Sequence, residues 1–350
     1  MISICIITKD ESKNIRECLK RLIPLKFEII VVDTGSIDNT KNIALEYTDK
    51  VFDYKWSNDF SAARNYSISK SSNEYVLIID SDEYLVESNK EELEILVEKN
   101  KKNVGRILRQ NILLDGNEQI KSNERINRLF LKSDFYYHGK IHEQITAKNG
   151  QDYDMYNVPI IIEHVGYSGD LHQKTRKTQR NIALLNQELK ENGDDPYILY
   201  QLGKSYFMQQ DYAKASEYFS KGLEFDLEPK LEYVIDMVET YGYALLNAKQ
   251  YEVALQFENI YNEFGNRADF KFLMGLIYMN NEMFKEAVEE FLKATRFKES
   301  QQDGVNSFKS FFNIGVIYEC LGDYDKAEMY YRKCEGYKRA KDRLHKTDIM

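Results

Sequence analysis

The segment that follows Tyr75–Ile79 places two carboxylates where they can act together. This apolar run leads directly into Asp80, Ser81, Asp82 and Glu83. In an extended chain the side chains at positions i and i+2 point to the same side, so Asp80 and Asp82 can converge on one hard cation. Open α/β sheets bind their ligands at the carboxyl ends of strands, and one or two carboxylates with substrate phosphates commonly hold a divalent ion. An acidic turn alone is usually a solvated loop or a helix cap, so the case for a metal site depends on the neighbouring loops.

Three further polar segments end predicted strands or open predicted helices. They are Thr8-Lys9-Asp10-Glu11, Asp33-Thr34-Gly35-Ser36-Ile37-Asp38 and Asp59-Phe60-Ser61-Ala62-Ala63-Arg64-Asn65. Thr8, Glu11 and Asp33 can give a nucleotide base the directional hydrogen bonds it needs. The planar guanidinium of Arg64 suits a diphosphate. The alternatives are turn chemistry for Thr8 and Asp33, a helix cap for Asp38, and a salt bridge to Asp59 or Asp82 for Arg64.

Strands alternate with short helices in the first hundred residues, which predicts a mainly parallel sheet. The expected strands cover 2–7, 27–32, 51–54 and 75–79, and the expected helices cover 12–22, 38–47, 61–69 and 91–99. Residues 104–165 read mostly as strand, with the best segments at 106–114, 128–131 and 158–164.

From Gln173 onward the pattern is helical and contains an internal repeat. Each repeat has a glycine followed twelve residues later by an alanine and nine residues later by an aromatic residue. The glycines are Gly203, Gly242, Gly275 and Gly315, at separations of 39, 33 and 40 residues. This pattern over about 196–337 resembles the tetratricopeptide repeat, in which stacked helix pairs leave a concave groove for a peptide or a second copy of the chain.

Composition narrows the class of protein. The 350 residues are 43% hydrophobic and 30% charged with only 4 prolines, which indicates a soluble globular chain of two domains. A net charge of −9 gives no basic surface for nucleic acid. The 4 cysteines form no CxxC pair, and no apolar run is long enough for a transmembrane segment, so we expect a cytoplasmic protein.

The polar loops, taken in order, resemble the family 2 glycosyltransferases, which have the GT-A fold. The resemblance covers about residues 1–170 and rests on a strand followed by DTGSxDxT, then AARN, then a strand followed by DxDE. It implies a nucleotide-sugar donor, with UDP-glucose or UDP-N-acetylglucosamine expected, and Mn²⁺ or Mg²⁺ as cofactor. Thr8, Glu11 and Asp33 would then hold the base and Arg64 the diphosphate. Asp80 and Ser81 would contact the nucleotide, and Asp82, with Asp80, the metal.

Two later motifs extend this resemblance. Members of the family that carry tetratricopeptide repeats have a stretch similar to Gly139-Lys140-Ile141-His142-Glu143. An inverting transferase needs a base for the acceptor proton, and Glu143 is the candidate, with His142 orienting it or lining the sugar pocket. His164 ends the last strand of this half and would complete the metal shell. Their alternatives are a surface strand pair for His142 and Glu143 and a hydrogen-bonded core residue for His164.

The sequence thus predicts an α/β GT-A domain at 1–172, a linker helix at 173–195 and an all-α repeat domain at 196–350. The expected activity is inverting transfer of one sugar from a UDP-hexose to a cysteine, serine or threonine of a peptide or protein, as in sublancin-type peptide glycosyltransferases. The repeats would bind the acceptor or form a homodimer. Other possibilities are a cell-envelope glycan acceptor and a non-catalytic scaffold with a relic GT-A domain.

Overall fold

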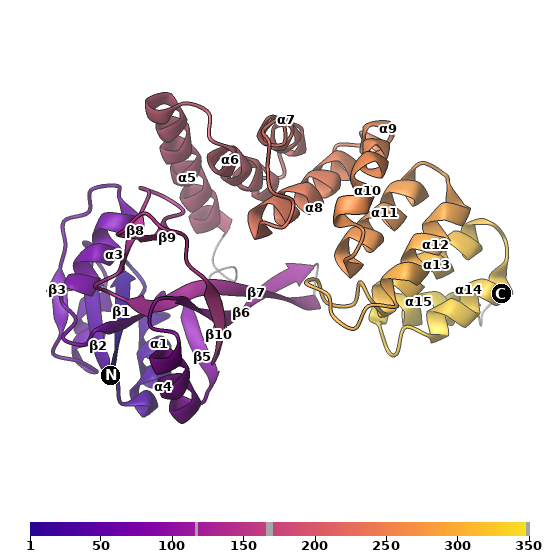
Figure 1. The fold of residues 1–350 in the computed structure, drawn as a ribbon. Helices are drawn as coiled ribbons and strands as arrows, with labels where there is room; N and C mark the ends of the chain where they lie inside the picture. Colours follow the sequence, from indigo (N-terminus) through magenta and orange to yellow (C-terminus); the bar gives the residue numbers. More distant parts are fainter. Residues whose placement is uncertain (116–117, 166–170, 348–350) are drawn as a thin grey trace. The chain divides into compact units, whose positions relative to one another are not determined.

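The computed structural model describes residues 1–115, 118–165 and 171–347, and the side chains of 113–121, 171–177 and 345–350 are outside this description. The chain divides into two compact units, Met1–Lys174 and Thr175–Met350 (Figure 1). Among the described residues, no helix combines the length and the apolar character needed to cross a membrane.

The N-terminal unit is built on a mixed sheet of eight strands in the order β3-β2-β1-β4-β7-β6-β10-β5. The half made of β3, β2, β1 and β4 is parallel, whereas β7 runs antiparallel to both β4 and β6. A separate pair, β8–β9, forms a two-stranded sheet. The strands are β1 (Ile2–Thr8), β2 (Glu28–Asp33), β3 (Val51–Asp53), β4 (Tyr75–Ile78), β5 (Glu83–Ser88), β6 (Val104–Asp115), β7 (Glu118–Leu131), β8 (Phe135–His138), β9 (Gln144–Ala147) and β10 (Met155–His164).

Apolar side chains cover both faces of this sheet. One cluster joins alternate β1 residues (Ile2, Ile4 and Ile6) to helices on the first face, namely α1 (Ile15–Leu22), α2 (Thr40–Leu45) and α4 (Lys90–Lys99). The other cluster joins Cys5 to α3 (Phe60–Ser69) and to the β8–β9 pair (Figure 1). A sheet buried on both faces needs continuous apolar strands, which explains why β1, β2 and β4 lack a polar alternation.

The predicted fold class is confirmed, with differences at the ends and edges of the sheet. β5, β8 and β9 were not predicted, and β7 begins ten residues before the expected segment 128–131. β5 lies at the edge of the main sheet, and β8 and β9 lie outside it. β7 lies inside the sheet, but its first ten residues are mostly polar, so no apolar run marks them. Asp38 is not the cap of α2, which begins after Asn39, although Oδ1 of Asp38 accepts from the backbone N–H of Thr40 at 2.9 Å.

The C-terminal unit consists of paired helices, as the repeat pattern predicted. A long helix, α5 (Leu171–Asn192), comes first, and α15 (Lys338–Thr347) comes last. Between them lie α6 (Pro196–Met208), α7 (Tyr212–Gly222), α8 (Glu232–Asn247), α9 (Tyr251–Ala254), the 3₁₀ helix Leu255–Ile260, α10 (Tyr261–Phe264), α11 (Ala268–Asn280), α12 (Phe284–Ala294), α13 (Phe308–Cys320) and α14 (Tyr324–Arg332) (Figure 1). In the second repeat the second helix is therefore broken into three short pieces.

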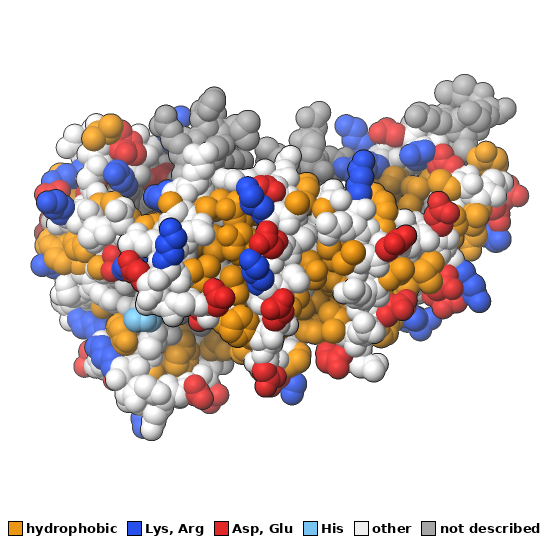
Figure 2. All heavy atoms as spheres, turned by 90° about the horizontal axis from the view of Figure 1, so that it is seen from above, with side chains coloured by type: hydrophobic (Ala, Val, Ile, Leu, Met, Phe, Trp, Pro, Cys, Tyr) orange, Lys and Arg blue, Asp and Glu red, His pale blue; other side chains and the backbone are white. Residues whose placement is uncertain are grey.

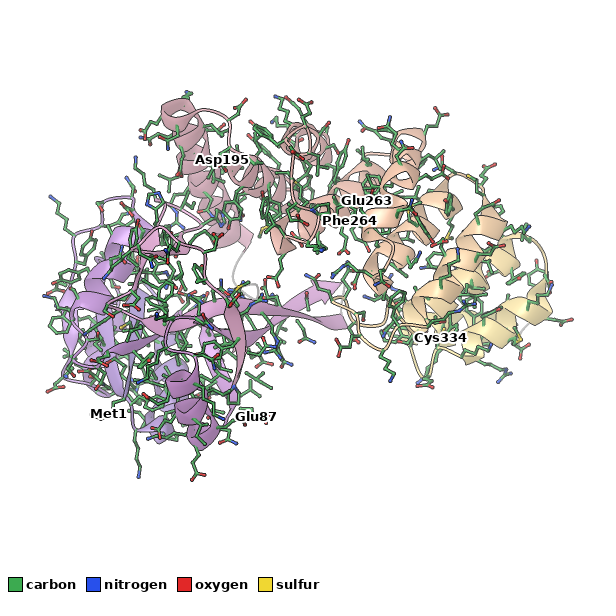
Figure 3. All side chains as sticks on the ribbon, in the orientation of Figure 1. Met1, Glu87, Asp195, Glu263, Phe264 and Cys334 are labelled. Carbon is green, nitrogen blue, oxygen red and sulfur yellow. The ribbon has the colours of Figure 1, made fainter. Side chains whose placement is uncertain are left out.

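The repeated glycines lie where two helices cross closely. A Cβ on Gly203 would lie 2.5 Å from the ring of Phe219, and a Cβ on Gly275 would lie 2.6 Å from the ring of Phe291. A larger residue would force these rings aside, which explains the fixed spacing of small and aromatic residues in the sequence. Local caps define the helix starts: Asp195, labelled in Figure 3, accepts from the backbone N–H of Ile198 at 2.9 Å.

The surface mixes charges of both signs. In the view of Figure 2, basic and acidic side chains of the described residues alternate across the face, with apolar side chains between them. Many of these charges are paired along helices, as with Lys221 and Glu217 at 2.8 Å and Arg332 with Glu328.

Candidate active site

The carboxyl ends of β1 and β2 bring Thr8 and Asp33 together. The two residues are register partners in the parallel pair, and both are buried. Oδ1 of Asp33 accepts from the backbone N–H groups of Gly35 and Ser36, each at 2.8 Å, so the carboxylate closes its own turn. Its other oxygen, Oδ2, and the Oγ1 of Thr8 are buried with no hydrogen-bond partner among the described residues. The turn therefore explains the hydrogen bonds of one Asp33 oxygen, Oδ1. It gives no hydrogen-bond partner to the other oxygen or to the Thr8 hydroxyl.

The loops after β1 and β2 are tied to each other. The backbone N–H of Asp10 donates to Oγ of Ser36 at 2.9 Å, and the carboxylate of Asp10 accepts from the N–H of Ile37 at 2.8 Å. Glu11 donates its N–H to Thr40 Oγ1 at 2.8 Å, and its carboxylate accepts from Asn14 at 2.7 Å. Glu11, three residues after Thr8, thus helps to hold the two loops together.

Asp80, at the end of β4, is held between two arginines. Nη2 of Arg64, on α3, lies 2.8 Å from Oδ1 of Asp80, and Nη2 of Arg128, on β7, lies 2.6 Å from Oδ2. Burial alone would raise the pKa of the Asp80 carboxyl, but the charges of Arg128 and Arg64 outweigh it and hold this pKa well below its usual range. Asp80 is therefore an ionised carboxylate whose two oxygens both accept from arginine. Ser81, beside it, is buried.

A fully buried carboxylate extends this network away from Asp80. One oxygen of Glu83 accepts from Arg128 at 3.1 Å and contacts Arg109 at 3.4 Å. The other accepts from the backbone N–H of Asp80 at 2.9 Å. Arg109, on β6, also contacts Glu124, on β7, at 2.7 Å. Acids and arginines thus alternate across the sheet, which offsets the desolvation of each buried charge.

Arg64 also reaches the loop that carries the predicted base. Its Nε donates to Oε1 of Glu143 at 2.5 Å, and the backbone N–H of Phe60 donates to the carbonyl of Lys140 at 2.8 Å, so two contacts join α3 to this loop. His142, next to Glu143, has a φ of 50°, a left-handed conformation that turns the chain sharply. The remaining guanidinium nitrogen, Nη1 of Arg64, is buried with no partner among the described residues.

The ring of Tyr137 packs against the guanidinium of Arg64. The Arg64 guanidinium lies 5.5 Å from the centre of its ring, a cation–π contact. Burial raises the pKa of Tyr137 to about 12, so its hydroxyl keeps its proton at neutral pH.

Asp82 and His164 meet on the other side of the acidic turn. Nε2 of His164 lies 3.5 Å from Oδ2 of Asp82, and the side chains are 16% and 15% exposed, so the pair is only partly open. Nδ1 of His164 faces Oδ1 of Asn111 at 2.9 Å. Within residues 1–115, 118–165 and 171–347, no three His, Cys, Asp or Glu side chains converge to hold a metal by themselves.

The structure therefore gathers most of the predicted residues along one edge of the sheet. Arg64, Asp80 and Glu143 form one connected group, Thr8 and Asp33 form a second, and Asp82 and His164 form a third. The salt bridge to a carboxylate that was the alternative for Arg64 is present, but its partners are Asp80 and Glu143 and not Asp59 or Asp82. Sequence reasoning gave no role to Arg109 and Asn111, at i and i+2 on β6, or to Glu124 and Arg128, four positions apart on β7. The available signal was polar side chains that recur on one face of a strand.

Comparison with solved structures gives weak overall matches. The crystal structure of S. aureus TarS 1–349 in complex with UDP-GlcNAc has a TM-score of 0.36 and 16% identity, over 83% of this chain and 91% of that chain. MamA 41-end from Desulfovibrio magneticus RS-1 has a TM-score of 0.39 and 23% identity, over 49% of this chain and 96% of that chain.

Two curated relatives match more than half of the chain. A TPR repeat-containing protein of Synechococcus elongatus is 28% identical over 274 residues, which are 73% of this chain and 66% of that protein. The SPbeta prophage-derived glycosyltransferase SunS of Bacillus subtilis is 29% identical over 233 residues, 63% of this chain and 53% of that protein. The chain thus spans between about half and two thirds of the length of these relatives.

Family models assign each part of the chain. The model described as glycosyl transferase family 2 matches residues 3–162. Tetratricopeptide repeat models match residues 196–228, 268–301 and 308–341. The first match contains every residue of the site except His164, which lies two positions beyond it. The chain therefore carries a family 2 glycosyltransferase domain followed by tetratricopeptide repeats.

Proposed function

We propose that this protein transfers one sugar from a UDP-sugar to a side chain of a peptide, with inversion at the anomeric carbon. Thr8 and Asp33 bind uracil, Arg64 binds the diphosphate, Asp82 and His164 bind a divalent cation, and Glu143 takes the acceptor proton. The proposal extends the glycosyltransferase assignment of residues 3–162 to a donor, a set of roles and an acceptor class.

The observation that carries the proposal is a set of three buried polar atoms that lack a partner among the described residues: Thr8 Oγ1, Asp33 Oδ2 and Arg64 Nη1. A buried polar atom without a hydrogen bond costs about 1–3 kcal/mol, so such atoms at a strand edge indicate a missing ligand. Asp33 needs a donor, which the N3–H of uracil supplies and the N3 of cytosine does not. Arg64 Nη1 needs an acceptor, which a diphosphate oxygen supplies.

The position of these atoms supports a nucleotide site. β1 pairs with β2 on one side and with β4 on the other, so the order of the strands reverses at β1. Open α/β sheets bind nucleotides in the crevice outside such a switch point. Thr8 ends β1, Asp33 ends β2, and Asp80 follows β4.

The residues of the acidic turn fit a cation unequally. Asp82 and His164 fit, because Asn111 Oδ1 faces Nδ1 of the imidazole and leaves Nε2 as the ligand atom, directed at the Asp82 carboxylate 3.5 Å away. Asp80 does not fit as a direct ligand, because arginines occupy both of its oxygens. Two protein ligands with diphosphate oxygens and water match the coordination that Mg²⁺ and Mn²⁺ prefer. Such an ion, when bound, neutralises charge on the departing diphosphate.

The protein's own groups perform the remaining steps. Arg64 Nη1 stabilises the negative charge that grows on the diphosphate as the bond from the anomeric carbon to the leaving oxygen breaks. The acceptor hydroxyl or thiol forms its new bond from the opposite face, and Glu143 takes its proton. Glu143 is 11% exposed and fixed through Arg64, so the base and the leaving-group arginine are positioned by the same guanidinium.

The repeat domain supports a peptide acceptor. Stacked helix pairs present an extended surface that binds other polypeptides. SunS, whose sequence aligns with 63% of this chain, carries the name glycosyltransferase. We therefore favour a peptide or protein acceptor, or a second copy of the chain, over a glycan.

Calorimetric titration with UDP, UDP-glucose and UDP-N-acetylglucosamine, with and without Mn²⁺, tests the proposal. We expect metal-enhanced binding of the nucleotides and slow release of UDP from one donor. Asp82→Ala and His164→Ala should both remove the metal enhancement. Asp152→Ala, a change to an exposed carboxylate of the same domain, should leave it intact.

Each outcome discriminates between functions. Binding without release of UDP, even with a peptide library present, would indicate a nucleotide-binding protein and not a transferase. No binding of any uridine nucleotide would favour the scaffold with a relic domain, in which the repeats alone are functional.

A further inference from the structure

Neighbouring strands place Asn111 beside His164. The two residues are register partners in the parallel pair β6–β10, near the carboxyl ends of both strands. Asn111 is 8% exposed, and its Oδ1 lies 2.9 Å from Nδ1 of His164. Because the backbones of both strands are fixed by the sheet, this contact does not depend on a mobile loop.

Two further side chains fix the orientation of the Asn111 amide. Its Nδ2 donates to Oε1 of Glu124 at 2.5 Å. The same carboxylate accepts from Nε and Nη2 of Arg109, at 2.9 and 2.7 Å. An ionised carboxylate accepts hydrogen bonds and donates none, so the amide nitrogen must face Glu124 and the amide oxygen must face His164.

This orientation determines the form of the imidazole. An amide oxygen accepts only, so Nδ1 of His164 carries the proton, and the lone pair of the neutral ring lies on Nε2. We infer that Asn111 is a positioning residue for the Asp82–His164 pair: through the Glu124–Asn111–His164 chain it selects the Nδ1–H form and directs Nε2 toward a divalent cation. The inference rests on the proposed cation site and assigns Asn111 and Glu124 no contact with the ion.

Cation affinity tests the inference without turnover. Binding of Mn²⁺ to the full chain in the presence of UDP is followed by electron paramagnetic resonance, which measures free Mn²⁺. Asn111→Leu should raise the apparent Kd for Mn²⁺ by about 10–100-fold, the usual effect of losing an outer hydrogen-bond partner. Asn111→Asp retains an oxygen for Nδ1–H and should recover part of the affinity.

A matched control separates this effect from general damage to the strands. Asn123 lies on β7, pairs with Gln110 and is exposed, so Asn123→Leu makes the same chemical change away from His164. It should leave the Kd for Mn²⁺ unchanged. A Kd for Asn111→Leu within twofold of that of the unmodified protein would overturn the inference.

A second measurement needs neither a bound cation nor an altered Asn111. Long-range ¹⁵N–¹H spectra of the metal-free protein at pH 8 report which ring nitrogen of each of the 5 histidines carries the proton, and His164→Gln identifies the His164 signal. We expect the Nδ1–H form at His164, and the Nε2–H form would refute the inference. If the protein shows Nδ1–H but binds no Mn²⁺, the cation site fails, while the selection of the Nδ1–H form by Asn111 stands.

Discussion

Arg128 donates to Asp80 from the side opposite Arg64, at 2.6 Å, although 48 positions separate the two residues in the sequence. The same nitrogen lies 3.1 Å from Glu83, so one guanidinium contacts two acids of the turn that follows β4. The Asp80 carboxylate therefore has a structural role, because it accepts hydrogen bonds from both arginines. It anchors two arginines at the strand edge, and one of them, Arg64, has a buried nitrogen, Nη1, without a partner among the described residues.

Loss of Arg128 should therefore destabilise the N-terminal unit. Arg128→Met leaves Glu83, which is fully buried, and one oxygen of Asp80 without their shared partner. Removing one partner of a buried ion pair typically costs about 3–5 kcal/mol in the free energy of unfolding. Trp56, the single tryptophan of the chain, allows urea unfolding of this unit to be followed by fluorescence. Arg125→Met, an exposed change on the same strand, should cost under about 0.5 kcal/mol; equal losses in both variants would contradict this role for Arg128.

Asp33→Asn should weaken the binding of uridine nucleotides. The amide can still accept from Gly35 and Ser36, but its NH₂ group then faces the N3–H of uracil. Loss of a hydrogen bond to a charged group costs about 1.5–3 kcal/mol, which corresponds to a rise in Kd for UDP of about 10–100-fold. The new donor suits the N3 of cytosine, so the preference for UDP over CDP should fall or reverse.

Calorimetry with both nucleotides measures this preference. Asp53→Asn is a suitable control, because Asp53 also ends a strand of the sheet but is exposed and paired with Lys41. An unchanged ratio of UDP to CDP affinity in Asp33→Asn would remove Asp33 from the base site.

The sequence predicted the central fold because local pattern and burial coincide there. β1, β2 and β4 are apolar on both faces, and the repeats keep a fixed offset because Gly203, Gly275 and Gly315 each face an aromatic ring of the second helix. The antiparallel strands β5 and β7 and the β8–β9 pair were harder. Their polar residues pair with partners distant in the chain, as Arg128 of β7 does with Glu83 of β5, and no local pattern indicates such a partner.

The site was predictable residue by residue but not as a network. Short motifs marked Asp33, Arg64, Asp80 and Glu143. Asp33 ends β2, Asp80 follows β4, Arg64 lies on α3 and Glu143 directly precedes β9. The contact between Arg64 and Glu143 joins residues 79 positions apart, and the two-sided hold on Asp80 depends on a strand that runs antiparallel to β4. These relationships arise from the sheet order, which the motifs do not contain.

Glu143→Gln should separate binding from chemistry. The amide keeps the size of the side chain and can still accept from Arg64 Nε, so the Kd for UDP should change less than threefold. Loss of a general base typically lowers kcat by about 10²–10⁴-fold. The loss should be smaller for a cysteine acceptor than for a serine acceptor in otherwise identical peptides, because a thiol has a pKa much closer to neutral. Equal losses for both peptides would argue against proton removal by Glu143.

Glu239 should make the stability of the repeat domain depend on pH. This residue of α8 is 5% exposed, and burial raises its pKa to about 7, although Arg267 Nε lies 3.1 Å from its carboxylate and opposes the shift. The ordinary pKa is 4.5, so between pH 4.5 and 7 the unfolded chain releases a proton that the folded chain keeps. The stabilisation is therefore complete below pH 4.5 and is lost as pH rises to about 7, by at most about 3 kcal/mol at 1.36 kcal/mol for each pH unit. Glu239→Gln cannot ionise, so urea unfolding followed by helical circular dichroism should show a smaller loss of stability between pH 5 and 7.5. Glu217→Gln, which alters an exposed carboxylate of α7, should retain the slope of the unmodified protein, and the same slope in Glu239→Gln would place the pH dependence elsewhere.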